Sequence, residues 1–266
     1  MESLHDFTKG KILGPLLKFA YPVFLALFLQ AMYGAVDLMV VGQFGAPTDV
    51  SAVSTGSQVL NLVTFVVTQL AMGVTVGIGR AVGAHDDRDA GAVIGNAVTL
   101  FLAVSVVLAA VLTALVQPIL SIMSTPAEAV PGAAAYLTIC FIGIPFITAY
   151  NVISSIFRGL GDSRSPLLFV LVACVVNIVG DLILVAGFGM DAAGAAIATV
   201  LAQVVSVVFA VVLLVKKKLP FTITRKDFRL NPQCSLFLRI GLPLALQECL
   251  TQLSFLALCA FVNRLG

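Results

Sequence analysis

Long runs of apolar residues dominate the chain, and polar positions are gathered mostly between them. Seven runs reach about 20 residues or more, the length that a helix needs to cross the hydrocarbon core of a bilayer. Weak alternation within the runs argues against a transmembrane β-barrel. The pattern predicts an all-α integral membrane protein, a six-helix transmembrane bundle plus a seventh helix, with spans at residues 16–41, 50–78, 91–116, 132–157, 167–188, 193–215 and 236–262.

Composition supports a membrane class and excludes others. Hydrophobic residues make up 60% of the 266 positions and charged residues 11%, whereas soluble domains carry roughly 45–50% and about 25%. The net charge of +2 offers no basic surface for nucleic acid. The five cysteines lack metal-ligand spacing, so neither a zinc site nor a disulfide framework is expected. The lipid bilayer is therefore the expected partner, and no nucleic acid is.

The basic residues predict the orientation of the spans. If the seven spans alternate in direction, 14 of the 15 Lys and Arg residues fall on one side of the membrane, and only Arg264 falls on the other. Positively charged loops remain in the cytoplasm. We therefore expect a multi-pass protein of the cell (plasma or inner) membrane, with a cytoplasmic N-terminus and a cytoplasmic loop between the sixth and seventh spans.

The first and seventh spans are similar to each other. Pro22 and Gly45 of the first recur as Pro243 and Gly266, at an offset of 221 residues. Because six spans separate the copies, the duplication would be parallel, as in transporters built from two six-helix halves. We expect an N-terminal six-helix transmembrane lobe at 1–215, a cytoplasmic inter-lobe linker at 216–235, and the first helix of a truncated second lobe at 236–266.

A shorter echo occurs at the cytoplasmic ends of two spans. Arg80-Ala-Val-Gly83 follows the second span, and Arg158-Gly-Leu-Gly161 follows the fourth. Arginine at a helix C-terminus complements the helix dipole, and glycine permits a left-handed cap. We interpret both arginines as topology anchors.

Carboxylates inside the spans are the main functional signal. Asp37, Asp181 and Glu248 fall well inside predicted helices, where a charge costs roughly 2.5–3.5 kcal/mol or more. Other polar residues share faces with them: Gln30 and Tyr33 with Asp37, and Asn177 with Asp181. Polar groups can simply join helices in lipid, but two aspartates would be a costly way to do so. We favour a water-accessible cavity with a site for a small cation or a proton.

Several motifs together resemble the multidrug and toxic compound extrusion family over essentially the whole chain. These are Pro22 with Gln30, Tyr33, Val36-Asp37 and Gly42-Gln-Phe-Gly45; Arg80-x-x-Gly83-Ala84; Arg158-Gly-Leu-Gly161-Asp162-Ser-Arg-Ser-Pro166; Asn177-x-x-x-Asp181; and Gly194-Ala-Ala-Ile-Ala-Thr199. The resemblance implies one lobe of a twelve-helix, two-lobe transporter, with the C-terminal lobe as a missing partner. It also implies a secondary active antiporter that exports cationic or amphipathic organic compounds in exchange for H⁺ or Na⁺.

The resemblance also implies roles for individual residues. The cation-coupling set, which would also hold any Na⁺, is Asp37, Asn177, Asp181 and Thr199. The cavity or substrate set is Gln30, Tyr33, Asn151 and Gln203; Gln203 is placed there because it follows Thr199 by one turn. Glu248 is a weak candidate, since it lies about a turn earlier than the family's acidic position in helix 7. No cofactor is expected besides the coupling ion.

Three other functions remain open. A polyprenyl-lipid flippase of the same superfamily is one alternative, although no basic residue lies in the middle of a span. A non-transporting membrane subunit or truncated half-transporter is another. An intramembrane enzyme is disfavoured, because His5 and His85, the two histidines, both lie outside the spans.

Overall fold

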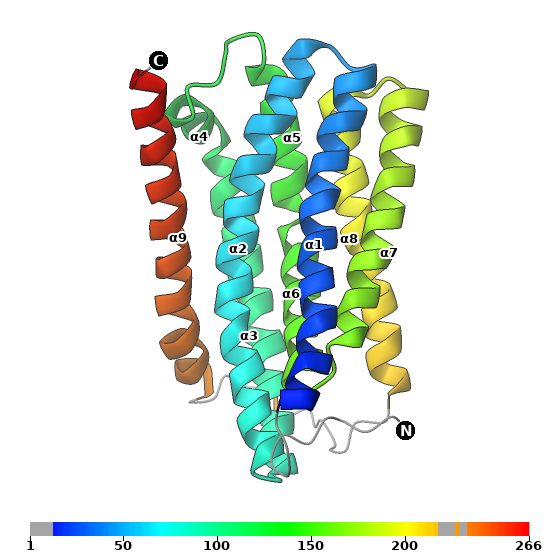
Figure 1. Ribbon diagram of the computed structural model, residues 1–266, viewed down its shortest axis with the longest axis vertical. Coiled ribbons are helices and arrows are strands. Elements are labelled where there is room, and N and C mark those ends of the chain that lie inside the picture. Colours follow the sequence, from blue (N-terminus) through cyan, green and yellow to red (C-terminus); the bar gives the residue numbers. More distant parts are fainter. Residues whose placement is uncertain (1–12, 218–226, 229–232, 266) are drawn as a thin grey trace.

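The computed structural model describes residues 13–217, 227–228 and 233–265. Over these residues the chain is helical and contains no strand, and the helices run roughly side by side in one bundle (Figure 1). The elements are α1 (Leu13–Phe44), α2 (Pro47–Gly83), α3 (Asp87–Ala114), α4 (Val116–Ile122), α5 (Val130–Ile142), α6 (Ile144–Gly159), α7 (Arg164–Asp181), the π-helix η1 (Leu182–Gly187), α8 (Asp191–Lys216) and α9 (Gln233–Leu265).

The predicted class is confirmed. In the described part of the chain, six helices are long and apolar enough to cross a membrane, and there are seven such spans if the bent pair α5–α6 is counted as one. Large apolar side chains of α1, α3, α7 and α8 are exposed, among them Phe24, Val107 and Val175, as expected for a surface that meets lipid rather than water. The end of the bundle at which α2 joins α3, drawn at the bottom of Figure 1, is called the lower end below.

Two spans are not the single α-helices that the apolar runs predict. The fourth bends by 49° between α5 and α6. Pro145, at the start of α6, has no N–H to donate to the preceding turn. Gly143 at the break lets the chain approach α8, since a Cβ there would lie 2.6 Å from the side chain of Val200. The fifth span changes from α- to π-helix directly after Asp181.

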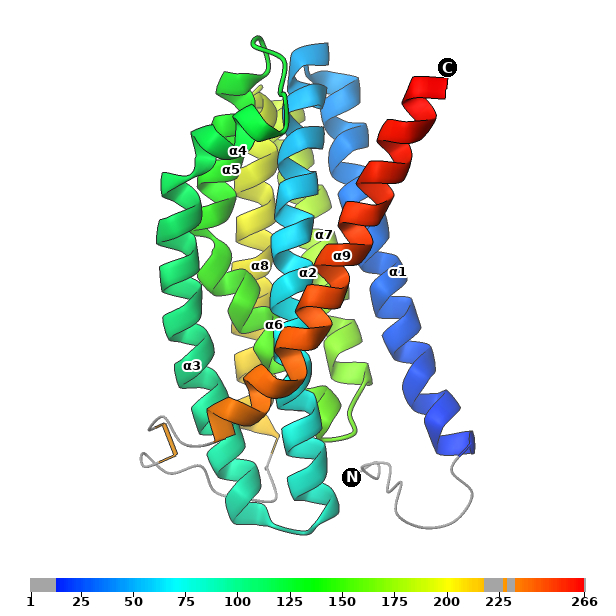
Figure 2. The ribbon, with the colours of Figure 1, turned by 90° about the vertical axis from the view of Figure 1, so that its left-hand side faces the viewer.

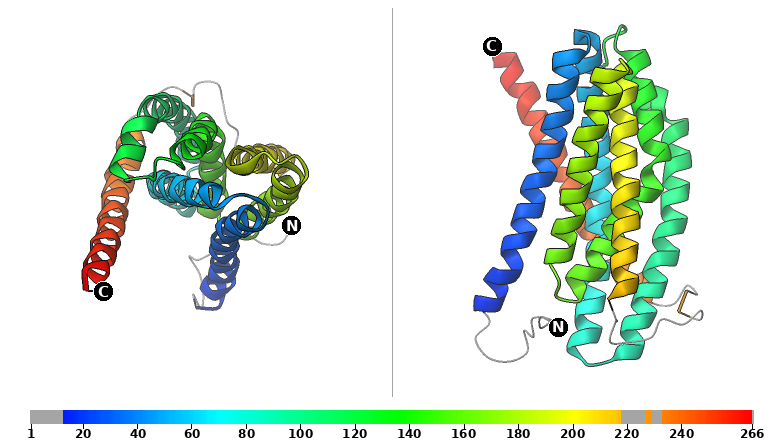
Figure 3. Two further views of the ribbon diagram at one scale, coloured as in Figure 1. Left: turned by 90° about the horizontal axis from the view of Figure 1, so that it is seen from above. Right: turned by 90° about the vertical axis from the view of Figure 1, so that its right-hand side faces the viewer.

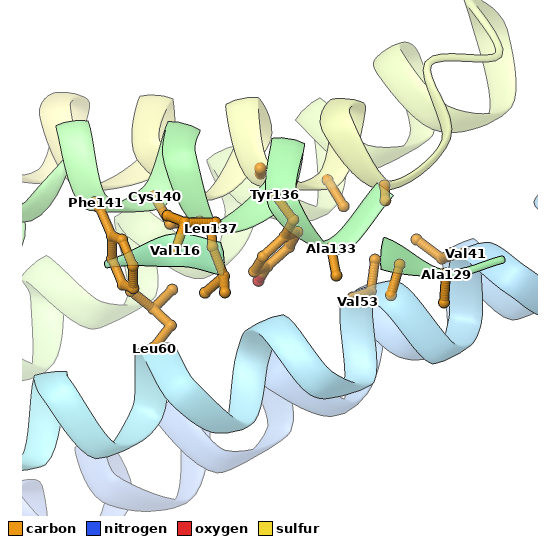
Figure 4. Close-up of a cluster of buried hydrophobic side chains, with 14 of the residues drawn as sticks. Val41, Val53, Leu60, Val116, Ala129, Ala133, Tyr136, Leu137, Cys140 and Phe141 are labelled. Atoms are coloured by element: carbon orange, nitrogen blue, oxygen red, sulfur yellow. The ribbon is translucent and has the colours of Figure 1, made fainter. Parts of the chain in front are cut away.

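One of three buried apolar clusters among the described residues is built around α5. Tyr136, Leu137 and Phe141 point from α5 toward α2, which carries Val53 and Leu60 (Figure 4). This contact needs a glycine on α2, because a Cβ at Gly56 would lie 2.4 Å from the Tyr136 ring. The close packing fixes α2 and α5 relative to each other.

The last helix crosses the bundle on one side. Near the lower end α9 touches α2 backbone to backbone: a Cβ at Gly73 would lie 2.7 Å from the Cα of Phe237. Just before α9, the carbonyl of Phe228 accepts a hydrogen bond from the Thr99 hydroxyl of α3 at 2.9 Å. Toward the opposite end α9 diverges from α2 (Figure 2). It runs in the same direction as α1, as the suspected repeat requires, and from above both helices lie at the edge of the bundle (Figure 3).

Candidate functional site

Three helices meet at Asp37, in the half of α1 away from the lower end. The carboxylate of Asp37 faces the side chains of Asp181 and Asn177 on α7 and of Thr199 on α8. All four side chains are buried, with exposures of 0–3%. Thr199 Oγ1 donates a long hydrogen bond of 3.3 Å to Asp37 Oδ2. The four residues predicted as the cation-coupling set therefore lie together.

Most polar atoms of this cluster have no hydrogen-bond partner among the described residues. They are Asp37 Oδ1, both carboxylate oxygens of Asp181, and both amide atoms of Asn177. Buried polar atoms are normally paired, since an unmade bond in a low-dielectric interior is costly. Carboxylate, amide and hydroxyl oxygens are the ligands that a hard cation prefers. The donor set fits a small cation or a proton shared between the two aspartates.

Close helix contact positions the cluster. Gly180, beside Asp181, packs against Ala198, beside Thr199: a Cβ at Gly180 would lie 2.9 Å from the Ala198 Cβ. The π-helix that begins after Asp181 also keeps this face aligned, because π-turns correct the drift of residues spaced four apart in an α-helix. As a result Asn177, Asp181 and Val185, spaced by four, are all buried.

The sequence missed one neighbour of the cluster. Cys140 of α5, one of the five cysteines for which no site was expected, is fully buried and lies close enough to Asp37 to interact with its charge. In the sequence, the only signal for Cys140 is that it follows Tyr136 by one helical turn. That spacing is equally typical of an apolar core, so it could not indicate a place beside Asp37.

The residues predicted for a cavity do not all join this cluster. Gln30 and Asn151 line a separate narrow cavity between α1, α2, α6 and α7. Asn151 is also engaged in packing: its Oδ1 accepts from Thr68 Oγ1 at 2.9 Å and its Nδ2 donates to the Ile147 carbonyl at 2.8 Å. Gln203 is partly buried on α8 with an unpaired Oε1. Tyr33 lies on α1, but its side chain is outside the described residues.

The acidic residue of α9 is apart from the cluster. Glu248 Oε1 accepts a hydrogen bond from Gln252 Nε2 of the same helix at 2.9 Å. Within the described ranges, α9 contacts α2 and α3 and none of the helices that carry the cluster. Glu248 is thus not part of this site.

At the lower end a second carboxylate is fully paired. Asp162, between α6 and α7, accepts hydrogen bonds from the backbone N–H groups of Arg164 and Ser165, from the Ser165 hydroxyl and from Lys217 Nζ. Burial alone would raise the pKa of Asp162. The bonds from Lys217 and Ser165 outweigh it and hold the pKa of this carboxyl below its usual value.

Comparison with known proteins gives a consistent picture. A family model described as MatE matches residues 22–183. The chain is 31% identical over 264 residues to a protein named probable multidrug resistance protein YpnP from Bacillus subtilis, covering 98% of this chain and 59% of that protein. It is 25% identical over 274 residues to the multidrug export protein MepA of Staphylococcus saprophyticus, again covering 59% of the relative. The chain thus spans about three fifths of the length of these curated relatives.

Solved structures agree. A MOP superfamily transporter from Pyrococcus furiosus superposes with a TM-score of 0.87 at 25% identity, covering 96% of this chain and 57% of that one. A structure described as MATE in the straight conformation superposes with a TM-score of 0.86 at 27% identity, covering 100% and 59%. Both matches extend over α9 as well as the six preceding spans.

Proposed function

Because the chain belongs to the MatE family, we propose that the complete protein is a secondary active antiporter that exports cationic or amphipathic organic compounds in exchange for H⁺ or Na⁺. The named multidrug resistance and export proteins among its relatives support export of this class. Within this proposal, 1–215 is the first lobe, 216–235 a cytoplasmic linker, and 236–266 the first helix of a second lobe.

One observation carries the proposal: two aspartates and an asparagine are buried in membrane-spanning helices, and most of their polar atoms have no partner in the described part of the chain. Two facing carboxylates repel when both are charged and attract a shared cation. The ion would therefore hold α1 against α7 and α8, and its loss would loosen that contact.

The polar contact at Asp37 joins α1 to α7 and α8. Ion occupancy would thus shift the balance between two positions of α1, and so between two states of the transporter. The proposed substrate positions, Gln30, Tyr33, Asn151 and Gln203, lie on α1 and on helices around it.

The test uses the complete protein in proteoliposomes loaded with a fluorescent organic cation. We expect Asp37→Asn and Asp181→Asn each to lower export at least about 100-fold, since each removes a charge that no neighbour replaces. Asp87→Asn, an exposed carboxylate at the start of α3, is the matched control and should export normally. Normal export by both buried variants would refute the proposed coupling site.

The coupling ion is tested in the same vesicles by imposing a pH gradient and a sodium gradient separately. Export driven by one gradient alone identifies the ion. Export that requires neither, but needs added nucleotide, would refute secondary antiport.

A further inference from the structure

The cavity between α1, α2, α6 and α7 that Gln30 and Asn151 line extends toward the lower end, where Arg158 and Ser163 line it, and none of the four cluster residues does. Its polar wall comes from α6 and the following turn, with Tyr150, Ser154, Arg158 and Ser163. Its α1 wall is mostly apolar, with Val23, Ala26 and Leu27 beside Gln30. Leu27 is also 54% exposed. The cavity therefore reaches the lipid-facing surface of the bundle.

Arg158 brings an uncompensated positive charge into this cavity. Its Nε donates to the Ser154 carbonyl at 3.3 Å, and in the described part of the chain no carboxylate lines the cavity. Asp162, four residues on, is already bound by Lys217 and Ser165. A guanidinium does not lose its proton in a protein, so a partly buried one is stabilised by an anion.

Ser154 supplies the second observation. It is 1% exposed and lines the cavity, yet its hydroxyl has no partner among the described residues. A serine hydroxyl can donate to an anionic oxygen. A fixed guanidinium beside a free hydroxyl donor is the combination that recognises a phosphate or carboxylate group.

We propose that this cavity binds the phosphate group of an anionic ligand, with Arg158 as the charged ligand and Ser154 as a hydrogen-bond donor. The volume of about 40 Å³ admits about three waters or the oxygens of one tetrahedral anion. Leu27 of the α1 wall is exposed, as are Phe24 and Phe28 of the same helix, so an attached alkyl chain lies along α1. This favours an anionic phospholipid of the leaflet at the lower end over free phosphate.

The proposal changes the interpretation of the two arginine motifs. Arg80, at the end of α2, is exposed and suits a topology anchor. Arg158 occupies the equivalent place in the last turn of α6, but it lines a cavity instead. Arg80 is therefore a matched control, since it carries the same charge at the same end of the bundle.

The test is native mass spectrometry of the complete protein in detergent, titrated with phosphatidylglycerol or with phosphatidylcholine. We expect Arg158→Gln to weaken retention of phosphatidylglycerol about 10-fold and Ser154→Ala about 3-fold, from the loss of one charged and one neutral hydrogen-bonding group. Arg80→Gln should stay within about 2-fold, and phosphatidylcholine binding should not change. Equal losses in Arg158→Gln and Arg80→Gln would overturn the proposal, because a diffuse basic surface would explain both.

A second arm separates the two sources of phosphate. Inorganic phosphate alone is added, and the thermal stability of wild type and Arg158→Gln is compared. Stabilisation that requires Arg158 indicates free phosphate, whereas Arg158-dependent retention of phosphatidylglycerol without a phosphate effect indicates lipid. Should Arg158→Gln fail to fold, Arg158→Lys and Ser154→Ala carry the test, and unchanged binding in both overturns the site. Because binding alone is measured, the result does not depend on export.

Discussion

One carboxylate, Asp162, connects three helices at the lower end of the bundle. It follows α6, accepts from the first N–H groups of α7, and pairs with Lys217 at the end of α8. Lys217 also lies over the ring of Phe157, 5.2 Å from its centroid. The pairing fixes the α6–α7 turn and occupies both carboxylate oxygens of Asp162.

We expect Asp162→Asn to lower Tm by about 3–6 °C at neutral pH, from the loss of charge-assisted hydrogen bonds. The effect depends on pH in a defined direction. Because the pKa of Asp162 is lowered in the folded protein, its contribution is full above the ordinary value of about 3.9 and is lost as pH falls through the lowered value. The difference in Tm between wild type and variant should therefore shrink below about pH 4. A constant difference from neutral to acid pH would contradict this.

At the scale of elements, the contact between α7 and α8 sets the geometry of the cation site. Gly180→Ala would place a Cβ 2.9 Å from the Ala198 Cβ and 3.3 Å from its Cα. Helix backbones cannot yield as a flexible side chain does, so the helices must separate. We expect a loss of about 1–3 kcal/mol in stability. Export should also fall at least about 10-fold, because Asp181 and Thr199 adjoin the displaced residues.

Gly83→Ala is the control, since nothing lies within 4 Å of a Cβ there. Alanine is the better helix former, so this variant should be as stable as wild type or slightly more so. Thermal unfolding in detergent and export in vesicles measure both effects. Normal export by Gly180→Ala would show that the α7–α8 spacing does not determine coupling.

The spans and the aspartate cluster could be predicted because lipid imposes severe rules. A span must be long and apolar, and a carboxylate inside one is rare. The break in the fourth span, between α5 and α6, could not be predicted in the same way. Pro22, Pro145 and Pro243 look alike in sequence, yet Pro22 and Pro243 lie within continuous helices. Only Pro145 begins a new helix, at a point where Gly143 also packs against α8.

The roles of single polar residues were harder still to predict. Asn151 lines the cavity and also accepts a hydrogen bond from Thr68, and this second role depends on where α2 lies. Arg158 and Arg80 look alike in the sequence. In the structure, Arg158 lines a cavity together with residues of α1 and α7. Such distinctions arise from the packing of segments far apart in the chain, which no local pattern encodes.

At the scale of the whole molecule, the orientation in the membrane has a direct test. The basic loops predict that the lower end faces the cytoplasm, because positive residues are retained there. His85 in the α2–α3 turn and Ala127 before α5 are exposed at opposite ends of the bundle. Each is changed to cysteine in the complete protein after its native cysteines have been replaced.

In intact cells, a membrane-impermeant maleimide should label Ala127→Cys fully and His85→Cys about 10-fold less, since a charged reagent does not cross the bilayer. Permeabilised cells should label both equally, which controls for thiol reactivity. Labelling of His85→Cys alone in intact cells would invert the orientation. The coupling ion would then enter from the opposite side of the membrane, and the Arg158 ligand would come from the opposite leaflet. The geometry of both sites would stay as described.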